Sequence, residues 1–200
     1  MLHRVFLFLL FAVSALPACA GEFNPKLSVG DPAPAWKNLP GVDGKRHSLA
    51  DLKEFKLVLV VFTCNSCDVA AGYEDRIIAF AKKHSNQVAV VAINVSVKPA
   101  DALPQMQERA KAKKVPFPYL FDASQAIGQD YGANYTPEFF LLNSDRKIVY
   151  MGSMDDSGDA DQVKDRYVEE AVEATLNGVV PSIQETVPRG CRIRYPRMRR

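Results

Sequence analysis

Apolar and polar positions alternate along this chain in blocks that predict strands and helices in turn. Continuous apolar runs of strand length at 57–62 and 88–95 predict strands that are covered on both faces. Between them, residues 68–83 are helix-compatible, with apolar positions at helical spacing. We therefore expect a strand, a helix and a second strand in succession.

The same alternation continues to residue 178. A polar helix is predicted at 104–114, where Pro104 suits the first turn, and a short strand at 119–121. A capped helix, a hairpin and an amphipathic helix follow at 122–131, 138–152 and 162–176. This order predicts an α/β domain whose mixed central sheet carries helices on both faces.

The first twenty residues have the pattern of an export signal. A basic start, a wholly apolar stretch at 5–13 and the small residues Ala18 and Ala20 indicate a signal peptide over 1–20. The apolar stretch is shorter than the ~20 residues that span a bilayer. Because Cys19 ends a segment that also resembles a bacterial lipoprotein box, lipidation there is the alternative to cleavage. Either outcome places the protein in a periplasmic or extracytoplasmic compartment that permits disulfides.

Composition predicts one globular domain, because 48% of the 200 residues are hydrophobic and 24% are charged. We expect this domain at 21–178 and a basic C-terminal tail at 179–200. The last twelve residues contain six arginines and no acid, which leaves a net charge of −4 for the rest of a chain of net charge +2. The tail is either simply solvated or attracted to anionic lipid or an acidic partner, and we expect no nucleic-acid binding from an exported chain.

Cys64 and Cys67 directly follow the first predicted strand. Two intervening residues bring both thiols onto one helical turn, close enough for a disulfide. A helix that begins at Cys64 would stabilise its thiolate through the helix dipole. The alternatives are half of a zinc site, for which Cys191 and two histidines offer no second close pair, and a static disulfide, whose small loop stabilises little. We expect redox chemistry without a metal or a cofactor.

Three segments resemble the thioredoxin-like redoxins. They are the strand that ends in Cys64-Asn65-Ser66-Cys67, the segment that begins Tyr135-Thr136-Pro137 and the hairpin over 143–152. The match is best with the peroxiredoxin-like branch, the alkyl hydroperoxide reductase and thiol-specific antioxidant family, and includes the ending at 188–193. The resemblance implies a thioredoxin-like fold.

The resemblance also implies roles for individual residues. Cys64 would be the exposed attacking thiol and Cys67 the more buried resolving thiol. Pro137, preceded by Thr136, would be a cis-proline that faces them. From the residues alone, an ordinary trans-proline at a strand start remains open.

The residues around the thiols favour disulfide exchange over peroxide reduction. Typical peroxiredoxins place threonine three residues before the peroxidatic cysteine, whereas Cys64 occupies that position here and Thr63 lies one residue too early. Thr63 or backbone amides could still stabilise an oxyanion. We expect a thiol-disulfide oxidoreductase whose Cys64–Cys67 dithiol exchanges disulfides with protein or small thiol substrates, together with an unidentified electron donor. A thiol peroxidase and a non-catalytic binding module are the alternatives.

Two further residues are candidates for accessory roles. Glu74 lies two helical turns after Cys67 and is either a proton acceptor through water or a solvent-facing acid. Cys191 is either an additional resolving thiol, whose thiolate Arg189 and Arg192 would stabilise, or a free surface cysteine.

Overall fold

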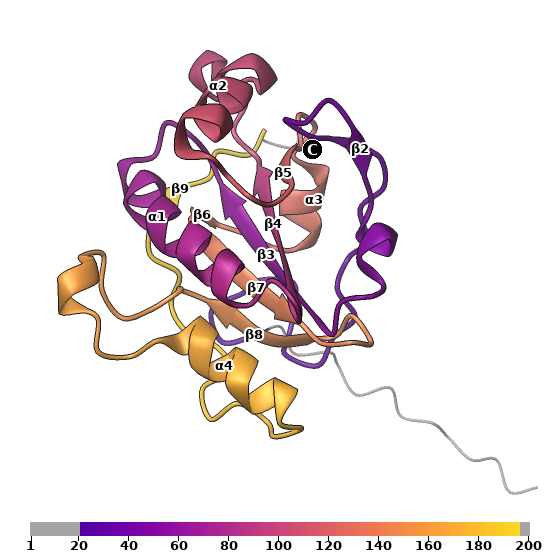
Figure 1. Cartoon of the computed structure of the whole chain (residues 1–200), viewed down its shortest axis with the longest axis vertical. Coiled ribbons are helices and arrows are strands. Elements are labelled where there is room, and N and C mark those ends of the chain that lie inside the picture. Colours follow the sequence, from indigo (N-terminus) through magenta and orange to yellow (C-terminus); the bar gives the residue numbers. More distant parts are fainter. Residues whose placement is uncertain (1–20, 197–200) are drawn as a thin grey trace, which may run out of the picture.

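A five-stranded mixed sheet forms the centre of the protein, and the computed structural model describes residues 21–196 (Figure 1). The sheet order is β5-β4-β3-β7-β8, in which β3 runs parallel to β4 and antiparallel to β7. The strands are β3 (Leu57–Thr63), β4 (Val88–Asn94), β5 (Tyr119–Phe121), β7 (Glu138–Leu142) and β8 (Ile148–Gly152). This confirms the predicted mixed sheet.

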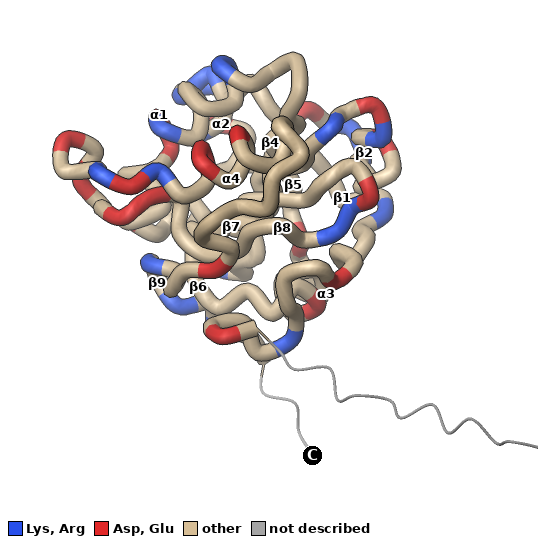
Figure 2. The backbone as a smooth tube through the Cα atoms, turned by 90° about the horizontal axis from the view of Figure 1, so that it is seen from below, with Lys and Arg blue, Asp and Glu red and all other residues tan. Residues whose placement is uncertain are grey.

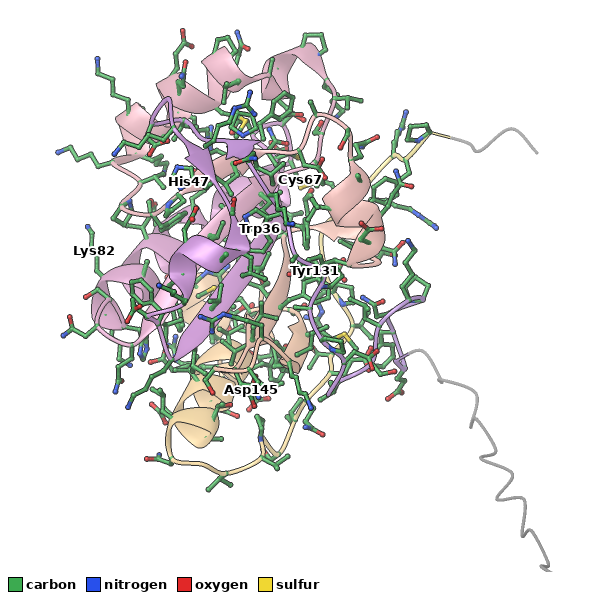
Figure 3. All side chains as sticks on the ribbon, turned by 90° about the vertical axis from the view of Figure 1, so that its right-hand side faces the viewer. Trp36, His47, Cys67, Lys82, Tyr131 and Asp145 are labelled. Atoms are coloured by element: carbon green, nitrogen blue, oxygen red, sulfur yellow. A yellow bond between two sulfur atoms is a disulfide. The ribbon has the colours of Figure 1, made fainter. Side chains whose placement is uncertain are left out.

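The central strand β3 is apolar throughout because both of its faces are covered. Leu57, Leu59 and Val61 contact the layer that contains α1 (Asp68–Lys83) and α4 (Tyr167–Leu176). The alternate side chains of β3 pack on the other face, with the N-terminal segment and α3 (Ala126–Asp130). Figure 3 labels Trp36 and Tyr131 near the middle of the molecule, and both are buried in that second layer.

The remaining elements are one further helix, two-residue strands and short 3-10 helices. They are α2 (Leu103–Lys113), β1 (Leu39–Pro40), β2 (Arg46–His47), β6 (Tyr135–Thr136), β9 (Cys191–Arg192) and the 3-10 helices η1 (Leu49–Leu52), η2 (Pro99–Asp101) and η3 (Ala160–Gln162). The helix expected from residue 162 begins only at Tyr167, because η3 and an extended stretch precede it. The part of the chain described here has no helix with the length and apolarity needed to cross a membrane.

Residues 179–196 run back along the domain instead of projecting from it. Near their start, the Glu185 carboxylate accepts hydrogen bonds from the backbone N–H groups of residues 22–24, and the Val187 carbonyl accepts one from the Ser153 hydroxyl. Further on, β9 pairs antiparallel with β6, and the two lie side by side in Figure 2. The expected signal over 1–20 and the last four residues of the expected tail lie outside the described residues.

Candidate active site

The two cysteines after β3 occupy different structural positions. Cys64 begins a turn that links β3 to α1, whereas Cys67 is the N-cap of α1 and its sulfur accepts a hydrogen bond from the Ala70 N–H at 3.4 Å. The helix therefore begins after Cys67 and not at Cys64. Its N-terminal dipole acts most directly on the Cys67 sulfur.

A buried acid fixes the turn between these cysteines. Asp101 is fully buried and accepts hydrogen bonds from the Ser66 N–H at 2.7 Å, the Ser66 hydroxyl at 2.6 Å and the Ser96 hydroxyl at 2.6 Å. Sequence analysis missed Asp101, because it lies 35 positions from Ser66 and no local pattern links the two. Two charge-assisted hydrogen bonds from Ser66 therefore hold the turn on Asp101, and the third ties Asp101 to the segment after β4.

The neighbouring Asn65 is held from the side of β5. The Tyr119 hydroxyl donates to Asn65 Oδ1 at 2.9 Å. Burial, together with the nearby Cys64 and Asp101, raises the pKa of Tyr119 above its usual value. This hydroxyl therefore keeps its proton at neutral pH and remains a donor.

The Thr136–Pro137 peptide bond is cis, as the resemblance implied, and lies directly against both cysteines. Cys67 Sγ is 3.0 Å from the Thr136 carbonyl oxygen, and Cys64 Sγ is 3.5 Å from Thr136 Oγ1. The Thr136 hydroxyl in turn donates to the Cys191 carbonyl at 3.4 Å. Thr136 therefore contacts all three cysteines of the described chain.

The structure joins Cys67 to Cys191 in a disulfide and, among residues 21–196, leaves Cys64 as the free thiol. The expected pairing of Cys64 with Cys67 is therefore not the one present, and Cys191 is not a free surface cysteine. The reason is the pairing of β9 with β6, which sets Cys191 opposite Thr136 and brings its Cα within 6.0 Å of the Cys67 Cα. The pairing joins positions 124 residues apart.

Exposure differs sharply among the three sulfur-bearing residues. Cys67 is 1% exposed and Cys64 is 8% exposed, whereas Cys191 lies on the surface. Cys64 is more exposed than Cys67, in the order that the resemblance implied, although both are buried. Among the three, Cys191 is the residue that a large molecule can reach.

A cavity of about 210 Å³ opens beside the disulfide. Cys64, Cys67, Thr136 and Cys191 line one part of it, and Ser66, Gln125 and residues 95–98 and 192–194 line the rest. Three of these side chains are basic and, within the described part of the chain, none is acidic. The positive lining favours anionic groups, including thiolates.

Glu138 follows the cis-proline and supports its backbone. The carboxylate is 3% exposed, and Oε2 accepts hydrogen bonds from the N–H groups of Asn134 at 2.7 Å and Tyr135 at 2.9 Å. Burial raises its pKa to about 7, against the opposing effect of these two hydrogen bonds. Sequence analysis missed this residue, because it lies within an apolar strand and has no motif of its own.

Thr63 and Glu74 lie away from the sulfur cavity. Both line a separate small cavity next to Phe117 and Tyr119. Glu74 is held by Arg109, which donates from Nε at 2.6 Å and from its terminal nitrogen at 2.9 Å. Glu74 is therefore paired with Arg109 and lines a different cavity from the cysteines, and the structure gives it a role between α1 and α2.

A model of the family described as Redoxin matches residues 28–167. The chain belongs to the redoxin family. Among solved structures, a hypothetical protein from Sinorhizobium meliloti is 32% identical, with a TM-score of 0.79 over 86% of this chain and 97% of that one. An uncharacterized conserved protein from Geobacillus kaustophilus is 29% identical, with a TM-score of 0.80 over 91% and 98%. Nearly the whole length of both of these proteins therefore aligns with this chain.

More distant structures define the fold of this redoxin. The thioredoxin domain of a thiol-disulfide oxidoreductase from Bacteroides vulgatus is 18% identical, with a TM-score of 0.53 over 62% of this chain and 86% of that domain. The fold is thioredoxin-like, as expected. No curated protein is significantly similar to the chain. The family and the fold place this protein among the thioredoxin-like redox proteins. The solved structures that resemble it include domains of oxidoreductases.

Proposed function

We propose that this redoxin is an exported thiol-disulfide oxidoreductase in which Cys67 is the central sulfur and exchanges between Cys191 and Cys64. The observation that carries the proposal is the meeting of a disulfide and a free thiol at one cis Thr136–Pro137 peptide. A disulfide that served only to staple the fold would not need a third sulfur beside it or a positively lined cavity.

The first step uses the difference in exposure. The thiolate of a client dithiol attacks Cys191 Sγ, because Cys67 is buried and Cys191 is not. A new bond forms between the client and Cys191, the bond from Cys191 to Cys67 breaks, and Cys67 leaves as a thiolate. The Ala70 N–H and the N-terminus of α1 stabilise that leaving group.

The second step completes a two-electron transfer. The other client thiolate attacks the client sulfur of the mixed disulfide, and Cys191 leaves as a thiolate that takes up a proton. The client is oxidised to a disulfide and the protein is reduced to a dithiol. In reverse, the same steps reduce a client disulfide, and the reduction potentials of the two partners set the direction.

Cys64 offers an internal route to the same central sulfur. Its side chain packs with Cys67 and Ala70 in one small buried cluster. A Cys64 thiolate that attacks Cys67 Sγ forms the Cys64–Cys67 disulfide and releases Cys191, without net oxidation. The expected pair is then a second state of the site, and Cys191 becomes available for transfer to another molecule.

Export completes the proposal. The apolar segment at 5–13 precedes a domain with a disulfide, which fits a compartment outside the cytoplasm. Protein clients and an electron donor in that compartment are the proposed partners. Mass measurement of the protein recovered from a bacterial host tests this, since removal of residues 1–20 and lipidation at Cys19 give different masses.

The decisive experiment measures disulfide exchange directly. We expect the protein to accelerate reduction of insulin by dithiothreitol, and Cys67→Ser to abolish the acceleration. Cys64→Ser is the matched variant, because it removes a neighbouring thiol and leaves the disulfide in place, and we expect it to retain part of the activity. Equal rates for the native protein and Cys67→Ser would refute the proposal.

A further inference from the structure

The chain beyond Cys191 is attached to the domain by contacts of its own. Ile193 packs against the apolar layer that contains α3, and its N–H donates to the Asn134 carbonyl at 2.8 Å. The Tyr195 hydroxyl donates to the Ala133 carbonyl at 2.7 Å. These contacts use no sulfur atom, so they do not require a closed disulfide.

Gln125 joins the same stretch to the residues that follow β4. Its side chain is buried, and Nε2 donates to the Arg194 carbonyl at 3.1 Å and to the Val95 carbonyl at 2.7 Å. All three residues line the cavity beside the disulfide. One buried amide therefore ties residues 193–195 to a second segment of the cavity wall.

Gly128 makes room for the end of the Tyr195 side chain. A Cβ at this position of α3 would stand 2.7 Å from the Tyr195 hydroxyl oxygen and 2.9 Å from Val95 Cγ1. Burial, together with the nearby Glu138 and Asp122, raises the pKa of Tyr195 above its usual value, so the hydroxyl keeps its proton and remains a donor. Residues 193–195, held by Gln125, α3 and residues 133–134, form what we call the tail clasp.

The chain is also held before Cys191. The Val187 carbonyl accepts a hydrogen bond from the Ser153 hydroxyl, and the Arg189 guanidinium donates to the Asp156 carbonyl at 2.6 Å. Cys191 therefore lies between two anchored stretches. Opening of the disulfide breaks one sulfur–sulfur bond and leaves the backbone on both sides of Cys191 attached.

We infer that the tail clasp keeps Cys191 beside Cys67 in the reduced protein as well, so that a macromolecular client enters exchange at Cys191 and not at Cys67. The inference rests on the proposed disulfide exchange and adds Tyr195 and Gln125 to it as positioning residues. Cys67 is 1% exposed, and β9 contacts both β6 and α1, which flank it. A large molecule reaches Cys67 directly only after this segment has left, and the clasp opposes that departure.

The clasp serves the step that releases a reduced client. The Cys191 thiolate attacks a client disulfide, the bond between Cys191 and the client forms, and the other client sulfur leaves as a thiolate. The Cys67 thiolate then attacks Cys191 Sγ, which forms the Cys67–Cys191 bond and expels the second client thiolate. Two electrons and the two protons of the protein thiols pass to the client. Because the clasp holds Cys191 within reach, the second attack needs no movement of the segment.

Labelling of Cys67 tests the clasp without any turnover. The starting protein is the full chain with Cys64→Ser and Cys191→Ser, treated with a maleimide that carries polyethylene glycol, and peptide mapping follows the label at Cys67. We expect slow labelling, because it waits for local opening, and at least about tenfold faster labelling with Tyr195→Ala. Tyr195→Phe removes one hydrogen bond and keeps the ring, so we expect a smaller acceleration.

Two controls separate positioning from loss of the fold. Val187→Ala is the matched variant, because it shortens an exposed side chain on the other side of Cys191, and we expect it to leave the labelling rate unchanged. Low urea concentrations should change the rate little, since local opening exposes little surface. Equal labelling rates for Tyr195→Ala and Val187→Ala, or a steep dependence on urea, would overturn the inference.

Hydrogen exchange of the native chain tests the same inference without a substitution. The Ile193 N–H reports on the clasp through its bond to Asn134. We expect its exchange, followed by NMR, to stay at least about a hundredfold slower than in an unfolded peptide after reduction with dithiothreitol. Exchange at the rate of the unfolded peptide would contradict the clasp. Neither readout needs disulfide exchange, so a failed insulin assay counts against the proposed function and these outcomes count against the clasp.

Discussion

Removal of Cys191 should destabilise the fold by an amount that the length of the closed loop sets. The disulfide joins residues 124 positions apart, so it restricts the unfolded chain strongly. The chain-entropy relation gives about 5 kcal/mol for a loop of this length at 25 °C. This is a large part of the roughly 5–15 kcal/mol that stabilises an ordinary domain. We expect Cys191→Ser to lose up to about 5 kcal/mol of unfolding free energy.

Guanidinium denaturation of four samples measures this quantity. The oxidised native protein should be the most stable, and the reduced native protein and Cys191→Ser should unfold at similar, lower denaturant concentrations. Cys64→Ser keeps the disulfide, so it should remain within about 1 kcal/mol of the oxidised native protein. The denaturant dependence should also be steeper without the disulfide, because the unfolded chain is then less compact.

The reasoning fails if the oxidised native protein and Cys191→Ser differ by less than about 1 kcal/mol. The same free energy also sets the redox behaviour, because the fold stabilises the disulfide as much as the disulfide stabilises the fold. About 5 kcal/mol corresponds to a reduction potential roughly 100 mV lower than that of the same pair in an unfolded chain. Equilibration with glutathione or dithiothreitol buffers measures this difference.

Three further predictions concern individual side chains. Burial raises the pKa of Glu138 from 4.5 to about 7, so between these pH values the folded state binds a proton that the unfolded state has lost. The free energy of unfolding should therefore fall as pH rises from about 4.5 to 7, by up to ~3 kcal/mol relative to Glu138→Gln. Denaturation of both proteins at pH 5 and pH 8 measures the difference. Asp101→Ala should remove the buried acceptor that three partly buried donors of Ser66 and Ser96 share, cost about 1–3 kcal/mol and slow disulfide exchange. The exposed Asp145→Ala should do neither, and unchanged melting of Asp101→Ala would contradict the predicted anchoring. Glu74→Gln should weaken its ion pair with Arg109 and cost about 1 kcal/mol while the insulin reduction rate stays the same, and a slowed rate would restore Glu74 as a proton acceptor.

The main architecture can be predicted from the sequence, because a strand that is buried on both faces has a continuous run of apolar residues. The apolar run of β3 alternates between two layers, so every position must be hydrophobic, and the pattern predicts both the strand and its place at the centre. The cis-proline position follows from a motif whose residues lie close together in sequence. These features are local, and local patterns reveal them.

The chemistry of the site depends on contacts that no local pattern contains. The disulfide partner of Cys67 is decided by the two-residue pairing of β9 with β6, which is too short to produce a strand signal. The start of α1 depends on Asn65 and Ser66 being held by Tyr119 and Asp101 from other elements. The three cysteines are therefore found from the sequence, but the pair that is bonded in this structure is not.

The separation of the bonded cysteines also fixes the order in which they become available during synthesis. Cys64 and Cys67 leave the ribosome more than a hundred residues before Cys191. Until nearly the whole domain has been made, Cys64 is the one other cysteine of the same domain that Cys67 can meet. The native bond can therefore close only as a late step of maturation, and its closure marks a domain whose last strand has already docked.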